Sequence, residues 1–495
     1  MRLARKWRLM PPAPPTRPGQ RDLTTGPIGR SMLLFALPTL GTSFVQSLNG
    51  WVNSYWVGRL VGEAGITATA NANQVLFLLL SAVFGVGLAA TILVGQAMGR
   101  RDLGEAKRVV GTMATFFFGL SILIAFAGYL VTEPLLRAMG TPAAAHPLAA
   151  AYLRIIFLAL PFFYFNTYLS MTLRGTGDSR TPFYFSVLAT ALDVCLNPLL
   201  IRGIGPVPAL GIAGSATATL IGQGVGLFGL LLFAYARRFP IRLTGAELGL
   251  LRPDRRLLNA SIAKGIPMGL QMIVVAGSGF AMLSMVNRYG TVTGAAYGIA
   301  IQLWNIVGMP ALAVGAAASS FAAQNIGANR WDRVERTARA GIAINLVLTG
   351  ALILVVYAIE RPLAVRFLPH TPAAWAIITH INAVGLWAYL MLGAVFVLFA
   401  VVRATGAVFP PLIILTVALL IVRIPAARLL EPTLGVNAVW WTAPISMGVA
   451  LVLALAYYRF GKWREARMIA PEPVEAGAPP KGHGSPASEP SPASA

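Results

Sequence analysis

The sequence predicts an all-α polytopic membrane protein with twelve transmembrane helices in two pseudo-symmetric six-helix lobes. Three observations support this fold class. Of the 495 residues, 56% are hydrophobic and only 11% are charged, whereas a soluble protein of this size carries about 25% charged residues. Apolar stretches long enough to cross a bilayer recur from Ser31 to Arg459. The second half of the chain also repeats motifs of the first half.

Twelve apolar stretches define the predicted transmembrane helices in chain order. Each is predicted to be helical because a backbone inside a bilayer must satisfy its hydrogen bonds internally. Several exceed the ~20 residues needed to cross the hydrocarbon core, which indicates tilted or protruding helices. The predicted spans are 31–56, 66–97, 109–131, 148–172, 182–202, 211–236, 258–286, 293–325, 340–358, 374–402, 410–430 and 436–458.

These spans divide the chain into five segments. The first, 1–30, is basic and Pro-rich and lacks the apolar core of a cleaved secretory signal. An N-lobe at 31–236 and a C-lobe at 258–465, with six helices each, flank a cytoplasmic loop at 237–257. The last segment, 466–495, is rich in Pro, Ala, Ser, Gly and Glu and is predicted to be disordered.

The positive charge is distributed unevenly across the predicted membrane. The formal net charge is +22, from 39 Lys and Arg against 17 Asp and Glu. With the N-terminus inside the cell, 30 Lys and Arg fall on the cytoplasmic side and 9 on the other side, in agreement with the positive-inside rule. The pattern predicts a multi-pass protein of the cell (inner) membrane with both termini in the cytoplasm. It also explains the basic charge without nucleic-acid binding.

The chain repeats itself at a spacing of about 228 residues. Six predicted helices separate equivalent points, so the two halves have the same orientation, and an axis along the membrane normal is expected to relate them. Two lobes related in this way predict a central cavity that opens alternately to each side. The corresponding pairs are Pro38 with Pro267, Gly95–Gly99 with Ala323–Gly327, Arg174–Gly177 with Arg403–Gly406, and Pro182 with Pro411.

Asp193 is the only acidic side chain that falls inside a predicted span. It lies in Phe183–Ile201, which is otherwise apolar, and the other 16 acidic residues fall in loops, helix ends or tails. A carboxylate at that depth is costly, so an ionisable residue there is a candidate functional site. The single Cys195 excludes a disulfide framework within the chain and a multi-cysteine metal site, and no metal site is predicted.

Several segments together resemble the multidrug and toxic compound extrusion (MATE) family, within the larger flippase-like superfamily. The resemblance covers about residues 27–465, and the order, spacing and duplication of the motifs are more specific than any one of them. The segments that carry it are Val52–Gly58, Gly95–Gly99, Leu173–Asp178, Asn197–Ile201 and Gln324–Ala328. It implies twelve helices in two lobes, both termini in the cytoplasm, and cation-coupled efflux of organic, often cationic, compounds.

The chain departs from the family pattern at the residues that couple transport to an ion. Many members carry an Asp in helix 1 where this chain has Asn53, and members with an N-lobe cation site carry Asn and then Asp in helix 5. This chain has Asp193 and then Asn197. The NorM-like branch uses acids in helices 7 and 10, and Met272–Gly279 and Ala388–Leu398 contain none. The resemblance is therefore closer to the DinF-like branch.

Four residues form the predicted cation-coupling site. Asp193 and Asn197 share one helix face because they lie four residues apart. Asn53 is expected in the outer half of the bilayer, and Thr219 matches a family threonine in helix 6. One carboxylate, two amides and a hydroxyl would form a polar pocket suited to taking up and releasing a proton. The alternative interpretation is that these side chains are hydrogen-bonded packing residues.

A second set of polar and aromatic residues is predicted to line the substrate cavity. Polar side chains could keep the cavity wet, and an aromatic ring could stack on an organic cation. Helix packing and the aromatic belts of membrane proteins explain such residues equally well. The set consists of Gln46, Asn49, Asn166, Gln74 and Trp304.

The sequence thus predicts secondary-active efflux of organic, amphipathic cations by cation antiport, without a bound cofactor. The proton is the preferred coupling ion and sodium the alternative, because amide and hydroxyl oxygens suit either. The expected partners are small organic molecules and the lipid bilayer, and the expected state is a monomer. The alternative transport function is a flippase for lipid-linked precursors or polysaccharides. An intramembrane enzyme is disfavoured because no His has a sequence-evident catalytic partner within the membrane. No ATP-binding motif occurs, which favours an ion gradient as the energy source.

Overall fold

The computed structural model describes residues 22–203, 208–367 and 372–469. Over these residues, twelve helical spans are long and apolar enough to cross a membrane, which confirms the predicted number. Two of the spans are interrupted, because the tenth contains a turn at Leu386 and the eleventh contains a π-helix. The short helix α4 and the 3-10 helix η2 were not predicted.

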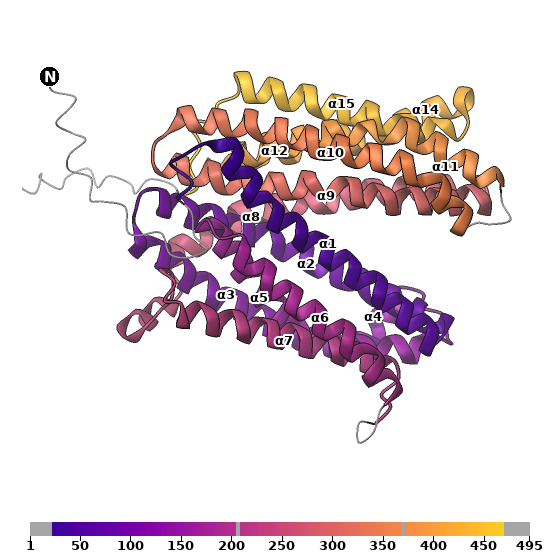
Figure 1. Ribbon diagram of the computed structural model, residues 1–495, viewed down its shortest axis with the longest axis horizontal. Coiled ribbons are helices and arrows are strands. Elements are labelled where there is room, and N and C mark those ends of the chain that lie inside the picture. Colours follow the sequence, from indigo (N-terminus) through magenta and orange to yellow (C-terminus); the bar gives the residue numbers. More distant parts are fainter. Residues whose placement is uncertain (1–21, 204–207, 368–371, 470–495) are drawn as a thin grey trace, which may run out of the picture.

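The first half of the chain forms one helical bundle, the N-lobe, and the second half forms the other, the C-lobe (Figure 1). Helices of the N-lobe are α1 (Ile28–Leu60), α2 (Glu63–Gly99), α3 (Leu103–Leu130), α4 (Thr132–Ala138), α5 (His146–Gly175), α6 (Arg180–Arg202) and α7 (Ile212–Ala236). The connection contains η2 (Gly245–Leu251). Helices of the C-lobe are α8 (Arg255–Asn287), α9 (Thr291–Gly327), α10 (Trp331–Phe367), α11 (Pro372–Gly385), α12 (Trp387–Arg403), α13 (Phe409–Thr416), η3 (Val417–Val422), α14 (Arg423–Leu434) and α15 (Asn437–Phe460).

Local capping explains where two of the long helices begin. The carboxylate of Asp102 accepts a hydrogen bond from the backbone N–H of Glu105 at 2.8 Å and so caps α3. Asp254 caps α8 by accepting from the N–H of Arg256 at 2.8 Å and of Leu257 at 3.2 Å. Such caps satisfy N–H groups that have no partner inside the helix.

The two lobes lie together at one end and diverge toward the other (Figure 1). The contacting end, where the described chain begins at Asp22 and ends at Ile469, is called the basal end, and the opposite end is called the distal end. Glycines allow the close approach at the basal end. A Cβ on Gly99 of α2 would lie 2.0 Å from the Gln324 carbonyl oxygen, and a Cβ on Gly327 of α9 would lie 2.1 Å from that of Gln96. Only glycine fits at such a contact.

Two equivalent glutamines also join the lobes at the basal end. The Gln96 side-chain amide of α2 donates to the Ala404 carbonyl of the C-lobe at 2.7 Å. The Gln324 side-chain amide of α9 donates to the Gly175 carbonyl of the N-lobe at 2.9 Å. All four residues belong to the motif pairs that the sequence repeat predicts to correspond. The repeat therefore appears in the structure as a reciprocal pair of inter-lobe hydrogen bonds.

Short segments at both ends of the described chain pack against the basal end. The Arg333 guanidinium of α10 donates to the carbonyls of Thr25 at 3.0 Å and Gly26 at 3.1 Å. Residues 466–469, at the start of the predicted tail, include the buried Met468, while 470–495 lie outside the described residues.

The inter-lobe connection is held to the N-lobe by an ion pair. The Lys107 ammonium of α3 donates to Glu247 of η2 at 2.5 Å and holds the pKa of that carboxyl below its usual value. This contact ties η2 to α3.

Candidate functional site

Asp193 of α6 lies in the N-lobe interior and is 3% exposed. Its carboxylate accepts a hydrogen bond from the Asn49 side-chain amide of α1 at 2.8 Å. The Thr219 hydroxyl of α7 lies 3.2 Å from both carboxylate oxygens. Three helices therefore contribute to one buried group, and the side chains that donate to it are neutral.

A second group of polar side chains lies one helical turn away. The Asn53 carbonyl oxygen accepts from the Asn197 amide at 3.1 Å and from the Ser215 hydroxyl at 2.6 Å. The Asn53 amide nitrogen lies 3.5 Å from the Tyr152 hydroxyl of α5. These contacts link α1, α5, α6 and α7 into one polar cluster, which is called the Asp193 cluster below.

Helical spacing and small residues explain why these side chains meet. Three helices each supply two residues four positions apart, so each pair lies on one helix face. Close packing of α6 on α7 brings two of the faces together, since a Cβ on Gly222 would lie 2.6 Å from the Ala189 carbonyl oxygen. The pairs are Asn49 with Asn53 on α1, Asp193 with Asn197 on α6, and Ser215 with Thr219 on α7.

The Asp193 cluster holds oxygen atoms that have no hydrogen-bond partner. The Oδ1 atoms of Asn49 and Asn197 are buried and unpaired. Among the described residues, no group of three His, Cys, Asp or Glu could hold a metal ion. One carboxylate among amide and hydroxyl oxygens can instead bind a proton or a single small cation, because burying a carboxylate without such a partner is costly.

The structure brings together all four residues of the predicted coupling site, namely Asp193, Asn197, Asn53 and Thr219. The role of these residues in coupling stays a prediction. Sequence reasoning did not assign Ser215 and Tyr152 to the site. Ser215 could have been identified from the sequence, because it lies four residues before Thr219 and therefore on the same helix face. The position of Tyr152 in the cluster depends on how α5 packs, which the sequence does not show.

The predicted cavity residues lie in different places. Asn49 belongs to the Asp193 cluster rather than to a separate cavity. Gln46 is exposed on α1. The Asn166 amide of α5 donates to the side chain and the carbonyl of Gln223 of α7, both at 2.9 Å. Gln74 is exposed and lines an apolar pocket of about 580 Å³ between α2, α3, α5 and α8.

Trp304 lies in the C-lobe, away from the Asp193 cluster, and takes part in a buried polar chain. Its indole N–H donates to the Asn382 Oδ1 at 3.0 Å, and the Asn382 amide donates to the Glu360 carboxylate at 2.7 Å. Glu360 was expected just beyond the end of the span at 340–358, but α10 continues to Phe367 and Glu360 is 6% exposed. Asp193 is therefore not the only buried acid on a spanning helix.

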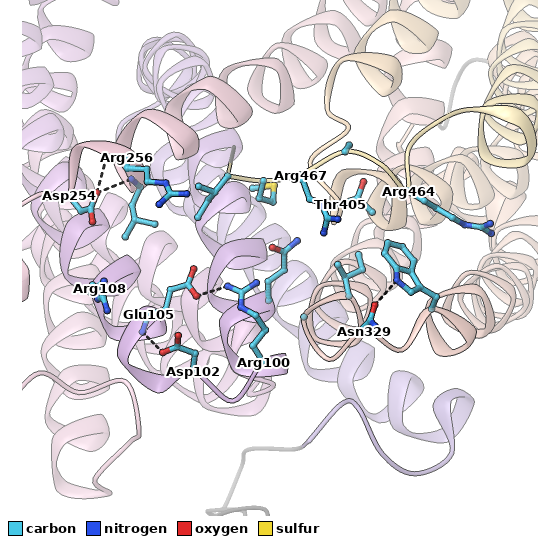
Figure 2. A pocket seen from close by; sticks show the side chains of 18 residues that line it. Arg100, Asp102, Glu105, Arg108, Asp254, Arg256, Asn329, Thr405, Arg464 and Arg467 are labelled. Atoms are coloured by element: carbon cyan, nitrogen blue, oxygen red, sulfur yellow. Dashed lines mark hydrogen bonds and ion pairs between the residues drawn. The ribbon is translucent and has the colours of Figure 1, made fainter. Parts of the chain in front are cut away.

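A charged pocket of about 620 Å³ lies between the lobes at the basal end (Figure 2). The N-lobe contributes Arg100, paired with Glu105 at 2.6 Å, together with Arg108. The C-terminal segment contributes Arg464 and Arg467. None of the residues of the Asp193 cluster lines this pocket. It shows that the basal contact between the lobes is polar at its rim.

Comparison with known proteins shows the same architecture elsewhere. The chain is 36% identical over 443 residues to the probable multidrug resistance protein YoeA of Bacillus subtilis, with 89% of this chain and 95% of that protein covered. It is 26% identical to an FAD transporter of Shewanella oneidensis, with 87% and 95% covered. A solved outward-facing structure of a multidrug resistance MATE family transporter has a TM-score of 0.83 at 21% identity, with 90% and 98% covered.

The profile of the MatE family matches residues 38–199 and 267–429. The two matches fall on the two lobes and correspond to the repeat described above. Together with the overall similarity to YoeA, they settle the family. The chain belongs to the MATE family of multidrug transporters, which are secondary transporters and not enzymes.

Proposed function

We propose that this efflux transporter exchanges an organic compound for a cation that binds at Asp193, with the proton as the preferred ion. One observation carries the proposal: Asp193 of α6 is buried against neutral donors from two other helices, α1 and α7. A carboxylate in such surroundings is most stable when it holds a proton or a cation. Because the carboxyl on α6 has its partners on α1 and α7, its state affects the packing of these three helices.

Sodium is the second candidate for the coupling ion. The unpaired Oδ1 atoms of Asn49 and Asn197 are hard oxygen ligands near a carboxylate, and hard cations prefer such ligands. A proton needs only one acceptor, whereas sodium would use several of these oxygens at once. Substitution of the Asn49 or Asn197 amide should therefore affect transport differently for a proton and for sodium.

The substrate class follows from the relatives and from the cluster. YoeA and YpnP of Bacillus subtilis are described as probable multidrug resistance proteins, which supports organic compounds as cargo. We infer amphipathic cations as the preferred class, as the family resemblance implies. A coupling site confined to the N-lobe would place this chain closer to the DinF-like than to the NorM-like branch. The flippase alternative is not favoured by the relatives.

The proposed cycle uses the contact between the lobes. Opening of the basal contacts at Gln96 and Gln324 would expose the cavity to the basal side, and their closure would leave the distal side open. With the basal end in the cytoplasm, as the Lys and Arg distribution predicts, export requires passage from the basal to the distal side. One chain contains both lobes, so a monomer suffices for this cycle.

The test is Asp193→Asn in proteoliposomes with an imposed pH gradient or sodium gradient. An amide keeps the shape and hydrogen bonds of the side chain but cannot release a proton, so we expect gradient-driven efflux to be lost. Binding of the compound, measured by fluorescence anisotropy on the purified protein, should persist. Asn166→Asp, which adds a carboxylate elsewhere in the N-lobe, serves as the control.

Wild-type efflux rates in Asp193→Asn would show that coupling occurs elsewhere. Efflux by the wild-type protein that a sodium gradient supports and a pH gradient does not would replace the proton by sodium. In that case Asn49→Ala and Asn197→Ala should weaken sodium dependence, because each removes one oxygen ligand.

A further inference from the structure

The C-lobe contains an arginine in the middle of a membrane-spanning helix. Arg423 is the first residue of α14, and the span from Phe409 to Leu434 includes both α14 and the π-helix Val417–Val422 that precedes it. Arg423 falls within the predicted span 410–430. In the structure it lies 14 residues after Phe409, which is about 21 Å along a helix at 1.5 Å per residue. This depth is within the hydrocarbon core.

Arg423 occupies the repeat position of Asp193. Asn49 and Ser278 are separated along the chain by the same number of residues as Pro38 and Pro267. Asp193 and Arg423 are separated by one residue more, and the π-helix before Arg423 accommodates one additional residue.

The contacts correspond as well. Asn49 donates to Asp193 at 2.8 Å, and the Arg423 guanidinium donates to the Ser278 hydroxyl at 3.4 Å. The two lobes thus carry opposite charges at equivalent positions.

The surroundings of Arg423 leave its charge unpaired. Its Nε atom is buried without a hydrogen-bond partner. The side chains of Tyr297 on α9 and Tyr389 on α12 lie near enough to interact with it electrostatically. Ser278 already donates its own hydroxyl to the Leu419 carbonyl of the π-helix at 3.2 Å. Among the residues that the structure describes, no Asp or Glu forms an ion pair with Arg423.

An unpaired guanidinium at this depth is costly unless a partner neutralises it. The buried acid that the structure describes in the C-lobe, Glu360, has its carboxylate bound to Asn382. A planar guanidinium with free N–H groups is suited to a carboxylate, sulfonate or phosphate, which it binds through two parallel hydrogen bonds. As a whole residue, Arg423 is neither fully buried nor exposed.

We propose that Arg423 and its tyrosine neighbours bind an anionic group of the transported compound. This inference rests on the proposed function and narrows its substrate class to compounds that combine a cationic part with a carboxylate, sulfonate or phosphate. The N-lobe supplies the ion-coupling carboxylate and the C-lobe supplies the anion-binding guanidinium.

The test compares two fluorescent probes that differ by one carboxylate. Rhodamine B is a zwitterion at neutral pH, and its ethyl ester is a cation of nearly the same shape. Binding of each to the purified protein in phosphatidylcholine nanodiscs is measured by fluorescence anisotropy, without any ion gradient. We expect the wild-type protein to bind rhodamine B about tenfold more tightly than the ester, because hydrogen bonds to charged groups are the strong ones.

Arg423→Gln should remove this preference, whereas Arg423→Lys should keep part of it. Equal affinities of the wild-type protein for both probes would overturn the proposal, whether or not Arg423→Gln folds. A preference that survives in Arg423→Gln would overturn it too. Asp193→Asn should keep the carboxylate preference, so failure of the coupling proposal is distinguishable from failure of this one.

A lipid headgroup offers the same chemistry as an anionic substrate. The binding measurements are therefore repeated in nanodiscs that contain phosphatidylglycerol. A preference for rhodamine B that persists there supports a substrate site. A preference that disappears with phosphatidylglycerol in the wild-type protein, together with less bound phosphatidylglycerol in Arg423→Gln, would assign the guanidinium to a lipid and overturn the substrate assignment.

Discussion

The Asp193 carboxylate is buried within the membrane-spanning bundle, where bulk water does not solvate it. Asn49 and Thr219 donate to it directly, and Asn197, one helical turn along α6, donates to Asn53. The cluster is built from amides and hydroxyls, which can donate to a carboxylate or accept from a protonated carboxyl after an amide flip or a hydroxyl rotation. This versatility is what a group that alternates between two charge states requires.

Asn53→Asp tests how closely the two halves of the cluster are linked. A carboxyl at position 53 restores the residue that many family members carry, so we expect transport to be retained. Two carboxyls in one buried cluster titrate as a coupled pair. The pH midpoint of efflux is therefore expected to shift by roughly one unit or more, as measured in proteoliposomes over a range of pH. An unchanged pH profile would place Asn53 outside the coupling site.

At the scale of the helices, small residues determine how closely α2 approaches α9. Gly99 and Gly327 face the carbonyl groups of the opposite lobe, and Gln96 and Gln324 add hydrogen bonds on either side. Each glycine lies within three residues of a bonding glutamine. The basal end is thus closed by a reciprocal contact that must break as a unit when the lobes separate there.

Gly99→Ala should weaken this contact. The added methyl would lie 2.0 Å from a carbonyl oxygen, and overpacking of this kind costs about 1 to 3 kcal/mol. We expect the basal end to open more often. The measurement is maleimide labelling of Ser320→Cys, a fully buried position on α9, in a Cys195→Ala background.

Gly119→Ala is the matched control, because a Cβ there meets no atom within 4 Å. Labelling should rise in Gly99→Ala and remain at the wild-type rate in the control. Equal labelling in both variants would mean that the glycine contact does not hold the basal end closed.

The described residues combine an intramembrane carboxylate in the N-lobe, Asp193, with an intramembrane guanidinium in the C-lobe, Arg423, that has no ion-pair partner among them. The two are related by the internal repeat and share the same type of helix contact. If Asp193 carries the coupling cation, each transport cycle exchanges one such cation. Glu360 is bound to Asn382 near the end of α10 and does not belong to the Asp193 cluster.

One coupling cation per cycle predicts how the transport of a monovalent cationic dye responds to the pH gradient and to the membrane voltage. Exchange of one proton for one such dye moves no net charge, so efflux should follow the pH gradient and ignore membrane voltage. The experiment measures dye efflux from proteoliposomes while valinomycin with potassium collapses the voltage alone or nigericin collapses the pH gradient alone. Efflux that stops when only the voltage is collapsed would require a second coupling charge.

Patterns along the chain determined the twelve helices, the two lobes and their correspondence. Long apolar runs must be helical in a bilayer, and a duplicated chain gives duplicated contacts, as Gln96 and Gln324 demonstrate. Asp193 was also recognisable, because a lone carboxylate in an apolar run has no other explanation than burial with partners. These features depend on local sequence or on its repetition.

Only the tertiary structure decided which side chains meet. Asn49 was predicted to line the substrate cavity, and its contact with Asp193 was not foreseen, because the direction of an α1 side chain depends on how that helix rotates against α6. Glu360 was assigned to a helix end, since hydropathy does not show that α10 continues beyond its apolar run. The match between Asp193 and Arg423 required the π-helix, which changes the register by one residue and leaves no signature in composition. Contacts between distant segments are set by packing, and a single sequence does not record it.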